Sequence, residues 1–266
     1  MSRPSGVRFG TVALWLAVGA VLAFLAVPIV VIALLSFTSG NYLTFPPPGL
    51  SLRWHRAVLA SPEWRGALVV SVRVAILTTT ASIVLSVASS FALVRGTFRG
   101  KRAAYALILA PLIIPTIISA IALHFLFSNL GLIGTTAAIV IGHTVLAMPI
   151  ATILVTGTLQ GFDVRLEQAA LSMGASRWTA FRRVTLPLIA PGVVSAALFS
   201  FLTSFEELLV PLFVAGPFNQ TLPLRVWNAI LFGLDPTITA VSTLLIGVTV
   251  VLLGVSALLR DRASAR

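Results

Sequence analysis

The chain has 266 residues, of which 58% are hydrophobic and only 9% are charged, and its mean hydropathy is +1.05. A soluble domain carries about 25% charged residues, so this composition excludes a soluble globular protein and indicates a chain that lies largely in lipid. The net charge of +11 comes from basic residues concentrated between long apolar runs, which is typical of the positive-inside bias of membrane proteins rather than of nucleic-acid binding. The absence of cysteine excludes disulfides and thiolate metal sites.

Six apolar runs are long enough to cross about 30 Å of hydrocarbon. They cover residues 11–35, 68–94, 104–127, 132–155, 189–214 and 238–259. The first run follows Arg3 and Arg8, as in a signal peptide, but it exceeds the roughly 7 to 15 apolar residues of a cleaved signal, so we expect a retained span. The pattern predicts an all-α membrane protein with six transmembrane helices, in which residues 1–266 form a single transmembrane domain.

The basic residues are divided unequally between the two sides of the predicted spans. Thirteen of the 18 lie in the two terminal segments, in 95–102 and in 165–183, and five, with Arg73 near the edge of its span, lie on the other side. This excess predicts that both termini and the long segment 156–188 are cytoplasmic. The other long segment, 36–67, is then external, where Trp54 and Trp64 suit the membrane interface.

The cytoplasmic segment 156–188 predicts two helices joined by a glycine corner. The first helix has an apolar stripe at three- and four-residue spacing. The stripe consists of Leu166, Ala169, Ala170 and Met173. Gly174 is suited to end this helix in the left-handed conformation, and Ser176 is suited to cap the next helix. The result is an apolar knob with a basic rim that a cytoplasmic partner can bind, and the alternative is an amphipathic loop that lies on the membrane surface.

The same segment resembles the EAA loop of the permease subunits of ATP-binding-cassette (ABC) importers. The similar positions are Gln168-Ala169-Ala170, Gly174, Val184 and Leu186-Pro187. In that family the loop docks on an ATPase subunit, so the resemblance implies an ATPase-coupling loop here. Its residues would be Glu167, Gln168, Ala169, Ala170, Gly174, Ala175, Ser176, Leu186 and Pro187. Gln168 replaces the usual Glu of the motif and Glu167 precedes it, so we expect the polar contact at this position to differ.

Four further segments are similar to the spermidine/putrescine-type branch of these permeases. They are residues 45–54, 98–101, 204–208 and 221–224. The resemblance implies a type I ABC importer permease fold in the bacterial cytoplasmic (inner) membrane and a small solute, with a polyamine favoured. The implied partners are two ATP-binding ATPase subunits, a second homologous permease subunit and an external solute-binding protein, besides membrane lipid and without nucleic acid. ATP and Mg²⁺ would be bound by the ATPase subunits and no cofactor by this chain, which lacks the phosphate-binding Gly-x-x-x-x-Gly-Lys-Ser/Thr loop.

Two acidic residues, Glu206 and Glu207, lie within the predicted fifth span. An ionised carboxylate there is costly unless it faces a cavity or has a partner, so at least one is a candidate for the substrate pathway. Adjacent helical positions point about 100° apart, and both are therefore not expected to face one cavity. The alternative is structural, with one glutamate paired to Arg73 and the other hydrogen-bonded between helices.

The remaining polar residues in the spans suggest no chemistry. His124 and His143 lie singly on apolar spans without metal-site spacing, and we expect both to be packed and hydrogen-bonded. Pro111, Pro115 and Pro149 are expected to kink or interrupt their helices, as is Pro211. No catalytic motif is present, so we predict no catalytic residue, no metal site and no enzyme. An ion-coupled secondary transporter with the two glutamates as coupling carboxylates is the alternative function, although no internal repeat supports it.

Overall fold

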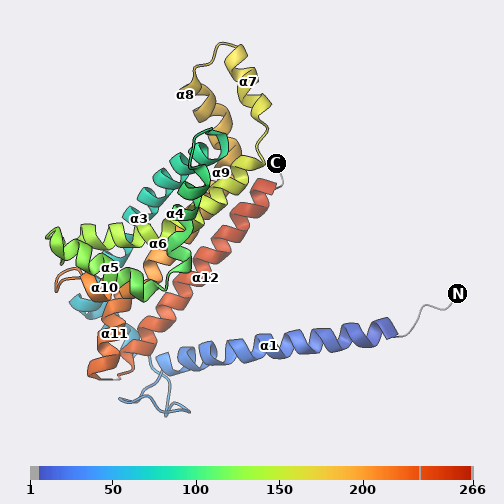
Figure 1. The fold of residues 1–266 in the computed structure, drawn as a ribbon. Helices are drawn as coiled ribbons and strands as arrows, with labels where there is room; N and C mark the ends of the chain where they lie inside the picture. Colours follow the sequence, from blue (N-terminus) through green and yellow to red (C-terminus); the bar gives the residue numbers. More distant parts are fainter. Residues whose placement is uncertain (1–5, 234, 265–266) are drawn as a thin grey trace. The chain divides into compact units, whose positions relative to one another are not determined.

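The computed structural model describes residues 6–233 and 235–264 (Figure 1). Its helices in chain order are α1 (Gly6–Ser36), α2 (Arg53–Ala60), α3 (Pro62–Arg95), α4 (Lys101–Ile113), α5 (Thr116–Asn129), α6 (Thr136–Gln160), α7 (Val164–Ser172), α8 (Arg177–Ala180), the π-helix η1 (Phe181–Thr185), α9 (Leu186–Glu206), α10 (Leu209–Val214), α11 (Leu222–Phe232) and α12 (Thr237–Ser264). Within these two ranges the extended pairing is limited to one isolated bridge between Thr38 and Leu50. The predicted all-α class is therefore confirmed.

Four stretches of helix in this part of the chain are long and apolar enough to cross a membrane. They are α1, α3, α6 and the continuous run from α8 through η1 to α9, and the bent pair α4–α5 makes a fifth if it counts as one span. The apolar part of α12 described by the structure, Thr237–Val251, is shorter. The count of six spans stays a prediction, because the described residues contain four such stretches, or five with the bent pair. The cytoplasmic termini also stay a prediction, and Arg3, Arg266 and the side chains of Arg8, Arg260 and Arg262 lie outside the described residues.

Two of the predicted spans are interrupted. The third, 104–127, is divided into α4 and α5, which meet at an angle of 107°. Ile114 is extended there, with φ −76° and ψ 129°, because Pro115 disfavours helical geometry in the residue before it. The fifth, 189–214, is divided into α9, which ends at Glu206, and α10, which begins at Leu209. Pro111 and Pro149, by contrast, lie inside the helices α4 and α6.

The chain forms two compact units, Met1–Pro62 with Asn228–Gly247, and Glu63–Trp227 with Val248–Arg266. In the first unit, side chains of α2 fasten the loop that follows α1. The indole N–H of Trp54 donates to the Gly40 carbonyl at 3.1 Å, and His55 stacks on Phe37 with ring centroids 4.8 Å apart. The segment predicted to be external is thus an ordered turn and a short helix.

The second unit is centred on α6, which packs closely against α9. A Cβ atom placed on Gly192 of α9 would lie 1.9 Å from Thr158 Oγ1 of α6, so only glycine permits this approach. Ala151 and Ala196 are buried in the same contact. Small residues let the backbones of membrane helices approach closely, and van der Waals packing then stabilises the pair.

A second cluster of buried residues joins α10 to the other end of α6. Val210 and Val214 of α10 pack against Phe127 of α5 and Ile139 of α6. Gly142 of α6 makes room for α10, because a Cβ at this position would lie 2.6 Å from Val210 Cγ1. Figure 1 shows α7 and α8 at one end of this unit and α10 at the opposite end.

Candidate functional site

The predicted helix, glycine corner and second helix are confirmed at residues 163–185, which we call the knob. Asp163 caps α7 by accepting a hydrogen bond from the Arg165 backbone N–H at 2.9 Å. Gly174 ends this helix with φ +86°, a left-handed conformation that suits glycine. Ser176 then caps α8 by accepting from the Thr179 N–H at 3.2 Å. The turn is therefore fixed by residues that are neighbours in sequence.

The outer surface of the knob is apolar. Met173 is 83% exposed and Trp178 is 68% exposed, and Leu166 is also exposed, whereas Ala170 and Ala180 are buried. Three exposed basic residues, Arg177, Arg182 and Arg183, border this surface. An exposed apolar patch with a polar rim is typical of a protein interaction site. The prediction from the sequence included the apolar stripe but not Trp178, whose single large side chain has no periodic signal.

The two candidate polar residues of the motif, Glu167 and Gln168, have different environments. Gln168 is exposed, as is Ala169. Glu167 lies 2.6 Å from Arg95 at the end of α3 in an ion pair, and it accepts a hydrogen bond from Thr185 at 2.8 Å. Helix periodicity separates adjacent residues by about 100°, so it predicts that they diverge, but it does not identify Arg95 or Thr185 as partners. The last two motif positions also differ in exposure, since Leu186 is half-buried and Pro187 is exposed.

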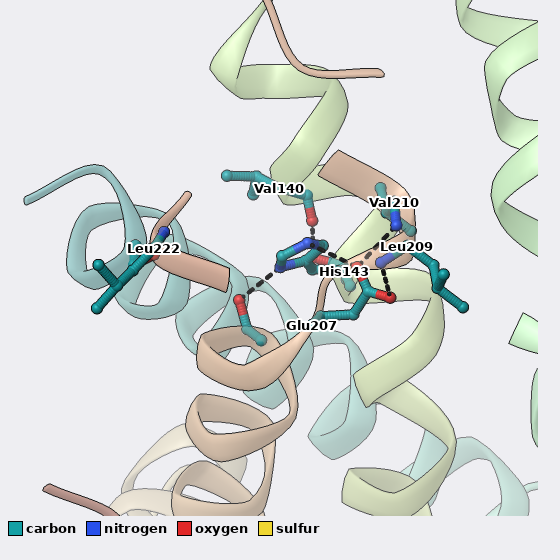
Figure 2. Close-up of polar contacts among 9 residues, drawn as sticks. Val140, His143, Glu207, Leu209, Val210 and Leu222 are labelled. Carbon is teal, nitrogen blue, oxygen red and sulfur yellow. Dashed lines mark hydrogen bonds and ion pairs between the residues drawn. The ribbon is translucent and has the colours of Figure 1, made fainter. Parts of the chain in front are cut away.

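Glu207 caps a helix that begins inside the predicted fifth span (Figure 2). Its carboxylate accepts hydrogen bonds from the backbone N–H groups of Leu209 at 2.9 Å and Val210 at 2.8 Å. A carboxylate at this end of a helix is favoured by the helix dipole and by the N–H groups that lack partners within the helix. The Glu207 side chain is only 9% exposed.

His143 completes this cluster from α6. Its Nε2 atom lies 3.4 Å from Glu207 Oε2, and its Nδ1 atom lies 2.8 Å from Ser204 Oγ of α9. His143 is completely buried, and His124 of α5 similarly lies 2.7 Å from the Phe213 carbonyl in α10. Both histidines are thus packed and hydrogen-bonded as predicted, and together they hold the two ends of α10. No group of metal-ligating side chains occurs within the described ranges.

Glu206 differs from its neighbour because it is exposed at the end of α9. It accepts a hydrogen bond from the Thr249 hydroxyl of α12 at 3.1 Å. Among the described residues, neither glutamate forms an ion pair with Arg73. The expected pairing with Arg73 is therefore absent, whereas the expected hydrogen bond between helices is made by Glu206 to α12. Glu207 is instead bound by the backbone N–H groups that follow it. A role of either glutamate in the substrate pathway stays a prediction.

These observations define a helical membrane protein with interrupted spans and an exposed apolar knob. Residues 85–265 match the family described as "Binding-protein-dependent transport system inner membrane component". The chain is 31% identical to the spermidine/putrescine transport system permease protein PotC of Haemophilus influenzae, over 90% of this chain and 93% of that protein. It is 32% identical to the putrescine transport system permease protein PotI of Escherichia coli, over 84% and 82% respectively.

The solved structures agree on the fold. A chain of a bacterial ABC transporter involved in the import of the acidic polysaccharide alginate superposes with a TM-score of 0.78 at 15% identity, over 96% of this chain and 98% of that chain. The protein belongs to the binding-protein-dependent transport system inner membrane component family. It is a multi-pass permease subunit of a bacterial ABC importer and is similar to the spermidine/putrescine branch, which leaves the ion-coupled alternative without support.

Proposed function

We propose that this permease forms half of the translocation path of an ATP-driven importer for a small organic cation of the polyamine class. In this proposal the chain crosses the membrane six times with both termini in the cytoplasm. The second half of the path is a homologous permease subunit, and an external binding protein delivers the solute. Two ATPase subunits bind ATP and Mg²⁺, and this chain binds no cofactor.

The exposed apolar surface of the knob is the observation that carries the coupling part of the proposal. Met173 is 83% exposed, and Trp178 is 68% exposed although its ring stacks on that of Phe181. Burying large apolar side chains is favourable by about 1.5 to 3 kcal/mol each. A cleft on an ATPase subunit would cover them, and the basic rim would face acidic groups there. ATP would bind the closed state of the ATPase dimer better than the open one. Closure of the dimer would then shift the path from its inward-open to its outward-open state.

The docking proposal is tested by Gly174→Asp in the assembled complex, compared with Gly174→Asn. Asn accepts the left-handed conformation at φ +86° and adds no charge, while Asp adds a carboxylate beside the apolar surface. We expect the Asp variant to lose ATPase co-purification and transport, and the Asn variant to keep most of both. Normal transport by the Asp variant would contradict docking at the knob.

The polyamine part rests on the relatives' names and on the exposed carboxylate of Glu206. A negative charge in a poorly screened path attracts a cation. The fold alone does not decide the solute, since the structural neighbour belongs to an importer of an acidic polysaccharide. Selectivity also rests with the binding protein.

The substrate is tested by measuring the ATPase activity of the reconstituted complex with its binding protein while spermidine, putrescine, a neutral solute or an anionic solute is added. We expect stimulation by the polyamines, and a smaller response after Glu206→Gln. The matched control is Thr249→Val, which removes the hydroxyl that donates to Glu206 but keeps the carboxylate. Stimulation by other solutes alone would retain the importer and exclude the polyamine.

A further inference from the structure

The knob is attached to the membrane helices in two ways. One is covalent, because α6 leads into α7 through residues 161–163 and α8 and η1 continue without interruption into α9. The other consists of contacts with α3, which is far away in sequence. These are the packing of Phe181 against Phe91 and the ion pair of 2.6 Å between Glu167 of α7 and Arg95, the last residue of α3. This ion pair is the more adjustable attachment, because it can form and break while the chain stays intact.

The surroundings of Arg95 favour one fixed position for its guanidinium. The group lies 4.8 Å from the ring centroid of Phe91 and 5.5 Å from that of Phe162, within the range of cation–π interaction. The side chains of Arg95 and Glu167 are only 26% and 18% exposed. Partial burial of this kind weakens screening by water and salt, so the pair is stronger than a fully exposed one.

Glu167 also contacts the segment that leads into α9. Thr185, the buried last residue of η1, donates its hydroxyl to Glu167 Oε2 at 2.8 Å. Phe181 at the start of η1 packs edge-on against Phe91 of α3, with centroids 5.5 Å apart. One carboxylate therefore joins α7, η1 and α3, at a π-helical turn of a kind that is frequent at functional sites.

We propose that Glu167 is a positioning residue that transmits movement of the knob to α3 through Arg95, and that it does not itself contact the ATPase. Gln168, which is exposed, supplies the outward polar group instead. This inference rests on the proposed docking of the knob. It adds a second route of force: α9 follows the knob through the chain, and α3 follows it through the ion pair. Loss of the pair would leave ATPase binding intact while α3 no longer follows.

The inference is tested on the complete importer with Glu167→Gln, Arg95→Gln and the charge exchange Arg95→Glu/Glu167→Arg. Arg99→Gln is the matched control, because Arg99 is exposed in the next turn of chain. The readouts are ATPase co-purification, ATP hydrolysis and the number of solute molecules moved per ATP. We expect normal co-purification in all variants, a ratio lowered about fivefold or more in the two single variants, and partial recovery in the exchange. Recovery of the transport ratio is only partial because the Thr185 hydroxyl loses its acceptor, the Glu167 carboxylate.

A covalent substitute for the ion pair provides an independent check. The chain contains no cysteine, so the double variant Arg95→Cys/Glu167→Cys offers a unique pair of thiols. Joining them with a short bismaleimide should raise the transport ratio above that of the unlinked double variant. A normal ratio in Glu167→Gln, or no recovery in both the exchange and the linked variant, would overturn the role of Glu167. Failure of the unaltered chain to retain an ATPase would instead overturn the docking proposal.

Discussion

The knob and the break between α9 and α10 both turn the chain sharply, but different interactions hold them. The knob is capped by Asp163 and Ser176, each bonded to a backbone N–H two or three residues away, and by the left-handed Gly174. The break is held by Glu207 together with His143, which comes from a different helix. The knob is therefore free to expose its surface to a partner, whereas α10 is fixed by the interior of the bundle.

This contrast predicts that substitutions in the bundle lower stability while substitutions on the knob lower coupling. The largest loss of stability is expected for Gly192→Ala, because the new Cβ would lie 1.9 Å from Thr158 Oγ1 and 2.7 Å from Thr158 Cβ. Threonine is β-branched and stiff, so α6 and α9 must separate to make room. We expect this to lower the free energy of unfolding by about 1 to 3 kcal/mol. The measurement is the apparent free energy of unfolding in mixed micelles.

The control for this prediction is Gly157→Ala in α6, where a new Cβ meets nothing within 4 Å. It should leave stability unchanged or slightly raised. Equal stability of the two variants would mean that the contact between α6 and α9 does not depend on Gly192.

A comparable but smaller loss is expected for Glu207→Ala, which removes the acceptor for Leu209 and Val210 N–H and the anionic neighbour of buried His143. Leaving buried donors unpaired costs about 1 to 3 kcal/mol. Glu207→Gln keeps one carbonyl acceptor and should be less damaging. The same unfolding measurement, with Glu206→Ala as the control at an exposed position, distinguishes a structural role from a role in the path. A larger loss of stability from the Glu206 variant would contradict our assignment.

The sequence predicted the two regions unequally well for the same physical reason. Caps, a corner glycine and helical spacing act over a few residues, so the knob and the interruption at Pro115 could be recognised directly. The partners of Glu207 and Glu167 lie on other helices, and nothing in the local pattern identifies His143 or Arg95. The prediction for Glu207 was limited by treating 189–214 as one span, since a carboxylate inside a continuous helix cannot cap a new one.

The smallest effect on stability, and the largest on assembly, is expected for Met173→Glu on the knob. Met173 is 83% exposed and contributes little to the folded subunit, so its unfolding free energy should change by less than about 0.5 kcal/mol. In the complex, however, the new carboxylate would be buried against the ATPase without a partner, and co-purification should fall about tenfold or more. Met173→Leu keeps an apolar side chain of similar volume and should assemble normally. If both variants assembled equally well, the docking surface would not include Met173. Trp178→Glu and Leu166→Glu would then decide whether the apolar surface or the basic rim holds the ATPase.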